Sequence, residues 1–289
     1  MGPRCSREAR WESQSSLRGE RVEVDAPFLR TTSWRVPPMY EQWLGHMAVN
    51  HGTSESERFR FFRIPEPGVS LALLIGPGRA ELLVSGATLK LLAVPPFPEC
   101  EVIGPIALRP GAARLLLGMP SSEIANQMIA AECIWGRWAR EVVERVTREQ
   151  TTELRILRLL DLLRMRLTGA PDTTTEQIVA LAATRRGGAS VRELADASGY
   201  SERQLRRIFL EHVGVGPKDF GRITRTAAAL RDLAAAPRSW SAYATVHGYY
   251  DQAHFIAEFQ ELVGQTPKRF LKSLVEPRLL EKHVAIQVE

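Results

Sequence analysis

The sequence predicts an α+β protein in which an N-terminal β-rich domain, sandwich- or barrel-like and carrying some helices, precedes an all-α domain. From Val22 to Leu108, short apolar runs are separated by Pro and Gly clusters at intervals of roughly 6–12 residues, which is typical of short antiparallel strands. After Gly118 the apolar residues recur at helical spacing, and the last third of the chain contains an internal repeat. A chain of 289 residues has room for about two such domains.

Composition excludes several classes of protein. With 44% hydrophobic and 25% charged residues, the chain is neither wholly disordered nor collagen-like nor a coiled coil. No apolar run reaches the ~18–20 residues of a membrane span, and Met1–Arg21 lacks the apolar segment of a signal peptide, so we expect a cytoplasmic protein with no membrane partner. The 3 scattered cysteines favour a reducing compartment. The net charge of +5 is compatible with a polyanionic partner.

The N-terminal domain is expected to consist mainly of strands. A short helix is predicted at Met39–Val49, and further helices begin at Ser121 and run over Glu132–Thr147. Strands are predicted at Arg58–Ile64, Val69–Ile75, Ala80–Val84, Leu89–Val94 and Glu101–Leu108.

A stripe of leucines follows on one face of a predicted charged helix. The stripe contains Leu154, Leu157, Leu160, Leu163 and Leu167, at steps of three and four. It indicates either a helix that covers the core of the β-rich domain or a seam between two copies of the chain.

The internal repeat places equivalent residues 49 or 50 positions apart. Gly199 and Tyr200 match Gly248 and Tyr249 at an offset of 49, whereas the later residues match at 50, so the second copy has one extra residue in its turn. The later pairs are Leu205 with Phe255, Phe209 with Phe259, Gly214 with Gly264, Pro217 with Pro267, and Phe220 with Phe270.

Each copy is predicted to form a helix, a tight turn and a second helix. In the first copy, Ser190 and Glu193 form the pattern of a capping box, Gly199 ends the helix, and Ser201 with Gln204 begins the next one. In the second copy, Gly248 ends one helix and Asp251 caps the next. Two helices joined so tightly are the helix-turn-helix pattern.

The second helix of the first unit has two distinct faces. Leu205, Ile208, Phe209 and Val213 share the side that must be buried, and Arg203, Arg206, Arg207 and Leu210 share the opposite side. Arginine binds guanine edges in the major groove or neutralises phosphate, so this exposed stripe is predicted to contact DNA.

This layout resembles the DNA-binding domain of AraC-type transcription regulators. The resemblance covers about Glu176–Leu274, and its most specific part is the run from Gly248 to Phe255, followed by Phe259, the run from Gly264 to Pro267, and Phe270. It implies that a long helix joins the two units, here Pro217–Ala235, where Pro217 favours the first helical turn. It also implies a transcription regulator whose N-terminal domain senses an effector, mediates dimerisation, or both. The expected divisions are a flexible tail (1–21), a sensor or dimerisation domain (22–169), a linker (170–175), the DNA-binding domain (176–275) and a C-terminal tail (276–289).

The second unit departs from the first in charge. Ala253, Ile256 and Ala257 stand at the positions of the three arginines, and no Lys or Arg occurs between Asp251 and Val263. We therefore expect the second unit to dock more weakly, with Ile256 and Ala257 contacting thymine methyl groups. The acids of this helix leave open an alternative, a protein-interaction regulator that has lost DNA binding.

The expected partners are double-stranded operator DNA, a small-molecule effector, RNA polymerase and a second copy of the chain. No motif for a catalytic centre, metal site or cofactor is present, so we expect neither an enzyme nor a cofactor. The predicted DNA-binding residues are Arg203, Gln204, Arg206, Arg207, Gln252, Ile256, Lys268 and Arg269.

Overall fold

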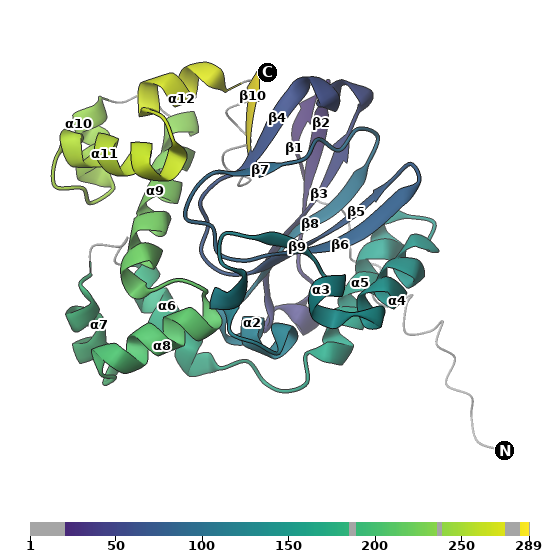
Figure 1. Cartoon of the computed structure of the whole chain (residues 1–289), viewed down its shortest axis with the longest axis horizontal. Coiled ribbons are helices and arrows are strands. Elements are labelled where there is room, and N and C mark those ends of the chain that lie inside the picture. The colour runs from purple at the N-terminus through teal and green to yellow at the C-terminus, as the bar shows by residue number, and fades with distance from the viewer. Residues whose placement is uncertain (1–20, 185–188, 236–238, 275–283, 289) are drawn as a thin grey trace.

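The structure, a computed structural model, describes residues 21–184, 189–235, 239–274 and 284–288 (Figure 1). The strands are β1 (Arg21–Ala26), β2 (Leu29–Trp34), β3 (Leu44–Gly52), β4 (Phe59–Arg63), β5 (Ser70–Gly76), β6 (Arg79–Ser85), β7 (Leu92–Val94), β8 (Glu101–Leu108), β9 (Met128–Ala130) and β10 (Val284–Val288). They form a seven-stranded sheet in the order β1-β2-β3-β8-β5-β6-β9 and a three-stranded sheet in the order β10-β4-β7. Every pairing between these strands is antiparallel.

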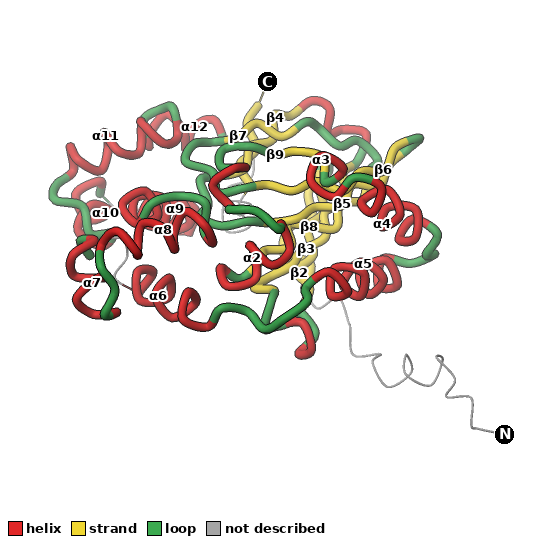
Figure 2. The backbone as a smooth tube through the Cα atoms, turned by 60° about the horizontal axis from the view of Figure 1, so that its bottom comes forward, coloured by secondary structure: helices red, strands yellow, loops and turns green. Residues whose placement is uncertain are grey.

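The helices divide between the two domains. Those that accompany the sheets are α2 (Pro110–Leu117), α3 (Glu132–Trp135), α4 (Arg137–Thr147) and α5 (Thr152–Arg166), with short 3-10 turns η1 (Pro38–Tyr40), η2 (Ser54–Arg58) and η3 (Ser121–Ile124). The C-terminal domain contains α6 (Thr173–Thr184), α7 (Val191–Ser198), α8 (Glu202–His212), α9 (Pro217–Ala235), α10 (Trp240–Val246), α11 (Gln252–Val263) and α12 (Pro267–Ser273). Figure 2 shows α6 to α12 gathered on one side of the molecule and the strands with α3, α4 and α5 on the other.

The α+β architecture is confirmed, and so are the five predicted strands. Strand β8 has the predicted bounds, β4, β5 and β6 differ by one residue at their ends, and β7 is three residues shorter at its start. The sequence did not predict β1, β2 or β9. The first of these begins at Arg21, the last residue of the predicted tail.

The helix predicted over Met39–Val49 is wrong. Only Pro38–Tyr40 forms a short 3-10 turn, and Leu44–Gly52 is strand β3. Leu, Met and Ala favour helices, but this segment lies between β2 and β8 and is largely buried on both faces, so it lacks the alternation that marks a strand. Pairing with two neighbours outweighs the local preference.

Helix α5 covers the core of the N-terminal domain, but its buried stripe is rotated from the predicted one. Leu160, Leu163 and Leu167 belong to the core, together with Ile156 and Leu159. Leu154 is 42% exposed and Leu157 is only partly buried. The core interpretation therefore holds for the C-terminal half of the stripe.

The α5 N-terminus is fixed to the sheet by a buried carboxylate. Glu101 of β8 accepts hydrogen bonds from Thr152 and from Arg155, whose Nη1 lies 2.5 Å away. Burial alone would raise the pKa of Glu101, but the nearby His51 ring and the hydrogen bonds from Thr152 and Arg155 outweigh burial and lower it to about 2.

Two segments that were predicted to be a linker and a C-terminal tail contain regular secondary structure. Helix α6 begins at Thr173, inside the predicted linker, where Asp172 accepts hydrogen bonds from the backbone N–H groups of Thr174 and Thr175. Within the predicted C-terminal tail, Val284–Val288 forms β10, which pairs with β4 along its whole length. The pairing partner is more than 200 residues away in the chain, so no local pattern could indicate this strand.

The domains meet along the connection between β6 and β7, residues 86–91, which we call the bridging loop. Ala87 of this loop is buried in the core of the first helix-turn-helix unit, and Leu91 packs against the core of the second. The Leu91 N–H donates to the carbonyl of Leu262 at 3.1 Å. Gly68, also in the N-terminal domain, donates its N–H to the carbonyl of Val213 at 3.2 Å. The N-terminal domain thus contacts both units at once.

Candidate DNA-binding surface

The first helix-turn-helix unit has the caps that the sequence predicts. Ser190 and Glu193 form a complete capping box at the start of α7, and Ser201 and Gln204 form another at the start of α8. Between them Gly199 has φ +72°, a left-handed conformation that glycine adopts without strain. These local interactions fix the start of α8 and the angle between the two helices.

Helix α8 presents its three arginines to solvent. Leu205 and Phe209 are fully buried, while the side chains of Arg203, Arg206 and Arg207 are exposed. Arg206 forms an ion pair with Glu202 one turn earlier, with 2.8 Å between Nη2 and Oε2. An exposed pair of this kind contributes at most about 1 kcal/mol, so it leaves Arg206 free to turn toward another anion.

Gln204, also predicted to contact DNA, has a structural role as well. Its Oε1 accepts hydrogen bonds from the backbone N–H and the hydroxyl of Ser201, at 2.9 and 2.8 Å. The carbonyl oxygen is therefore committed to the helix cap.

The second unit repeats this geometry with different side chains. Ser239 caps α10, Gly248 has φ +72°, and Asp251 Oδ1 accepts the His254 N–H at 2.7 Å to cap α11. Gln252 is exposed at the start of α11. Ile256 is only partly exposed, because part of its side chain packs against the core of the second unit.

The acids of α11 point toward the long helix α9 and are neutralised there. Glu258 is 7% exposed, and both of its carboxylate oxygens lie within 3 Å of Arg225 Nη2. Arg222 Nε lies 3.2 Å from Glu258, and its Nη2 lies 2.6 Å from Glu261. We call these four residues, Arg222, Arg225, Glu258 and Glu261, the helix clamp. The hydrogen bond with Glu261 is the main cause that raises the pKa of Arg222, and the bond with Glu258 adds to it. The same bond with Arg222 lowers the pKa of Glu261.

Tyr249 completes the junction between α9 and the second unit. The Arg225 guanidinium lies 4.7 Å from the centre of its ring, and its hydroxyl lies 3.2 Å from that of Thr226. Burial, with smaller effects of its neighbours, raises the pKa of Tyr249 to about 12. The helix clamp was not predicted from the sequence. The sequence indicates it only through the spacing of three residues between Arg222 and Arg225, which places both arginines on one face of α9.

The remaining predicted contacts lie on the last helix. Lys268 and Arg269 are exposed on α12, which begins at Pro267 and is anchored by the fully buried Phe270. All eight predicted residues therefore belong to α8, α11 and α12, and seven have exposed side chains, Ile256 being the exception.

A family model described as a helix-turn-helix domain matches residues 194–273, from α7 to α12. The C-terminal domain is an AraC-type helix-turn-helix domain. A search of curated proteins found no match to this chain.

The chain is also similar to solved structures of ToxT from Vibrio cholerae. One of them is 11% identical, with a TM-score of 0.42, over 85% of this chain and 98% of that chain. A second, bound to (E)-4-(8-methylnaphthalen-1-yl)but-3-enoic acid, is 14% identical with a TM-score of 0.41 over 85% and 98% of the two chains. A third, bound to an unsaturated fatty acid, is 8% identical with a TM-score of 0.38 over 86% and 96%.

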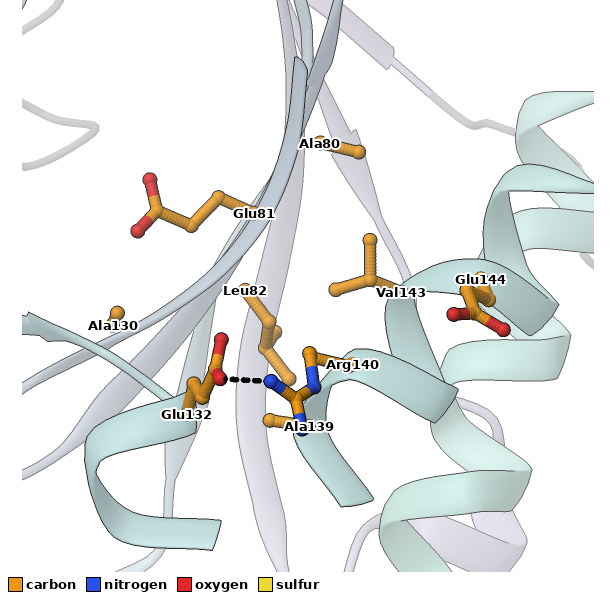
Figure 3. Close-up of a pocket in the computed structure, with 9 residues that line it drawn as sticks. All are labelled: Ala80, Glu81, Leu82, Ala130, Glu132, Ala139, Arg140, Val143 and Glu144. Atoms are coloured by element: carbon orange, nitrogen blue, oxygen red, sulfur yellow. Dashed lines mark hydrogen bonds and ion pairs between the residues drawn. The ribbon is translucent and has the colours of Figure 1, made fainter. Parts of the chain in front are cut away.

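Outside the AraC-type domain, a surface groove of about 250 Å³ lies between β6, β9 and α4 (Figure 3). Leu82 and Val143 line it with apolar surface, and Arg140 and Glu132 form an ion pair across it, at 2.7 Å. The inward side chains of β5 fill the core: Leu71 and Leu73 are fully buried.

Within residues 21–184, 189–235, 239–274 and 284–288, no group of three His, Cys, Asp or Glu side chains is placed to hold a metal ion. Across the same ranges no helix combines the length and the apolar character that crossing a membrane requires. Cys100 is buried, Cys133 is exposed, and both are free thiols.

Proposed function

We propose that this protein is a sequence-specific DNA-binding transcription regulator in which α8 enters the major groove and reads bases. The observation that carries the proposal is the exposed face of α8, where Arg203, Arg206 and Arg207 project from a helix whose start is fixed by a capping box. The N-terminal residues of a recognition helix are those that reach base edges. Arginine at such positions forks onto guanine O6 and N7.

The alternative, a protein-interaction module without DNA binding, loses its main support. That reading depended on an acidic α11, but Glu258 is buried and both acids of the helix clamp are paired with arginines of α9. The outward face of α11 is therefore close to neutral and does not repel phosphate.

Selection of bound sites from random duplexes by the full-length protein tests the proposal. We expect one half-site that is strongly constrained, read by α8, and a neighbouring half-site about one helical turn away that is degenerate, facing α11. Recovery of no enriched sequence, together with binding that does not weaken as salt increases, would contradict it.

The N-terminal domain is proposed to regulate this binding, because the bridging loop contacts both helix-turn-helix units. The groove of Figure 3 suits a compact effector with apolar surface and one charged group, which would compete for the ion pair between Arg140 and Glu132. Replacing Val143 with Trp fills the groove and should abolish the response of DNA binding to such an effector without changing basal affinity. Contact with RNA polymerase is part of the same proposal.

Dimerisation is proposed to use the outer face of α5. Leu154 and Met165 lie on this face, 42% and 70% exposed. The variant with both residues changed to Asp should sediment as a folded monomer, whereas the wild type should sediment as a dimer. Leu160 is unsuitable for this test because it is buried in the core. A wild type that remains monomeric at high concentration excludes the dimer.

A further inference from the structure

The turn of the second helix-turn-helix unit carries an exposed aromatic residue that the first unit lacks. In the first unit one residue, Tyr200, separates Gly199 from the N-cap Ser201. In the second unit two residues, Tyr249 and Tyr250, separate Gly248 from the N-cap Asp251. Tyr249 takes the inward position, 6% exposed, and the additional residue Tyr250 is 91% exposed.

The backbone around Tyr250 is fixed on both sides. Its N–H donates to Nδ1 of His254 at 3.3 Å, and the His254 backbone N–H is held by Asp251. The His254 ring packs edge-on against Tyr249, with 5.4 Å between the ring centres. The side chain of Tyr250 thus projects into solvent from an ordered turn directly before α11. Little additional ordering of the backbone is needed for it to bind a partner.

The surroundings of Tyr250 define the chemistry available there. The start of α11 has no Lys or Arg, so the second unit cannot hold phosphate through a charged group on its recognition helix. The tip of the turn offers the Tyr250 hydroxyl instead. Where a recognition helix enters the major groove, the residues that flank its N-terminus lie beside the sugar-phosphate backbone, and tyrosine hydroxyls are among the groups that donate to phosphate oxygens.

We propose that Tyr250 is a positioning residue for DNA: its hydroxyl donates a hydrogen bond to a backbone phosphate and thereby seats the weakly charged second unit. This inference rests on the proposed function, since it requires that the AraC-type domain binds DNA. It assigns to the second unit an uncharged anchor, where the first unit uses arginines.

The test measures binding of the full-length protein to a random-sequence duplex and to the selected duplex, by fluorescence anisotropy over a series of salt concentrations. Tyr250→Phe removes only the hydroxyl and should weaken binding to both duplexes by about 3- to 10-fold. Because the hydroxyl carries no charge, the slope of log Kd against log salt should equal that of the wild type. Lys268→Ala, by contrast, should lower that slope by about 0.9.

Tyr200→Phe is the matched control, because it removes a hydroxyl from the equivalent turn where the ring is half-buried, and it should leave the affinity unchanged. Equal affinity of Tyr250→Phe and the wild type overturns the inference, as does a Tyr250→Phe effect on one sequence only. If Tyr250→Ala loses affinity while Tyr250→Phe does not, the ring rather than the hydroxyl makes the contact, and the inference is wrong. A wild type that fails to bind either duplex contradicts the proposed function itself, so the two failures are distinguishable.

Discussion

At the scale of single residues, helix caps and glycine turns are the features that sequence patterns predict best. Ser190, Ser201 and Asp251 cap the helices at which they were expected, and Gly199 adopts the positive φ that the turn requires. These features depend on interactions between residues that are close in sequence, so the pattern contains all the necessary information. The partial burial of Ile256 was not predicted, because helical spacing alone cannot show how far a neighbouring core extends around a helix.

The buried carboxylate of Glu101 gives a prediction about pH. Its pKa is about 2 in the folded protein, below the usual 4.5, so it contributes stability above pH 4.5 that is lost as the pH falls toward 2. Glu101→Gln should lower the free energy of unfolding by up to about 3 kcal/mol at pH 7.

The comparison is made by urea unfolding of the wild type and Glu101→Gln at a series of pH values. The difference between the two proteins should be constant from pH 7 to 5 and narrow below pH 4.5. A difference that is independent of pH down to pH 3 is inconsistent with a depressed pKa at Glu101.

At the scale of elements, the helix clamp explains how α11 tolerates its acids, and the two glutamates allow a matched test. Glu258→Gln leaves Arg222 and Arg225 without the buried carboxylate that they share, and should destabilise the protein by about 3 kcal/mol. Glu261→Gln removes an ion pair on a side chain that is 61% exposed and should change stability very little.

Thermal unfolding of the two variants, one turn apart on the same helix, separates these effects. Equal melting temperatures for Glu258→Gln and Glu261→Gln would show that burial does not decide the contribution of the clamp. We also expect Glu258→Gln to weaken DNA binding, because α11 loses the contact that orients it against α9. Adding Arg225→Gln to Glu258→Gln should not restore the affinity for DNA.

Elements also show where local patterns fail. The segment Leu44–Gly52 overlaps the helix predicted over Met39–Val49, yet it is a central strand because β2 and β8 supply partners on both sides. For a related reason, the buried face of α5 is rotated from the predicted leucine stripe. Ile156 and Leu159 belong to the core of the N-terminal domain, whereas Leu154 lies at the exposed start of the helix. In both cases the partner surface, which is distant in sequence, decides which residues are buried.

At the scale of the whole molecule, a buried charge cluster joins the two domains. Glu66 of the N-terminal domain is 8% exposed and pairs with Arg63 at 2.8 Å. The Glu66 carboxylate also attracts the guanidinium of Arg231 on α9. Burial lowers the pKa of Arg231, and the negative charge of Glu66 offsets only part of that decrease. The bridging loop lies beside this cluster, since Thr88 and Glu66 exchange backbone hydrogen bonds.

Glu66→Ala should therefore loosen the junction between the domains. Removing the buried carboxylate takes a neighbouring negative charge away from two partly buried guanidinium groups, those of Arg63 and Arg231. We expect this to cost about 3 kcal/mol and to separate the unfolding of the two domains in calorimetry. Glu81→Ala, an exposed glutamate on β6, serves as the control and should unfold as the wild type does. A single, unshifted transition for Glu66→Ala would show that the cluster does not join the domains.

The central claim, that α8 reads sequence through its arginines, is tested most directly by the affinity of Arg207→Ala for the selected duplex and for a random duplex. A lost bidentate contact with guanine costs about 1–3 kcal/mol, so we predict a loss of about 5- to 150-fold on the selected duplex and a much smaller loss on the random one. Equal losses on the two duplexes would mean that Arg207 only neutralises phosphate. Unchanged affinity for both, with Ile256→Ala more damaging than Arg207→Ala, would place sequence reading in the second unit and contradict the account.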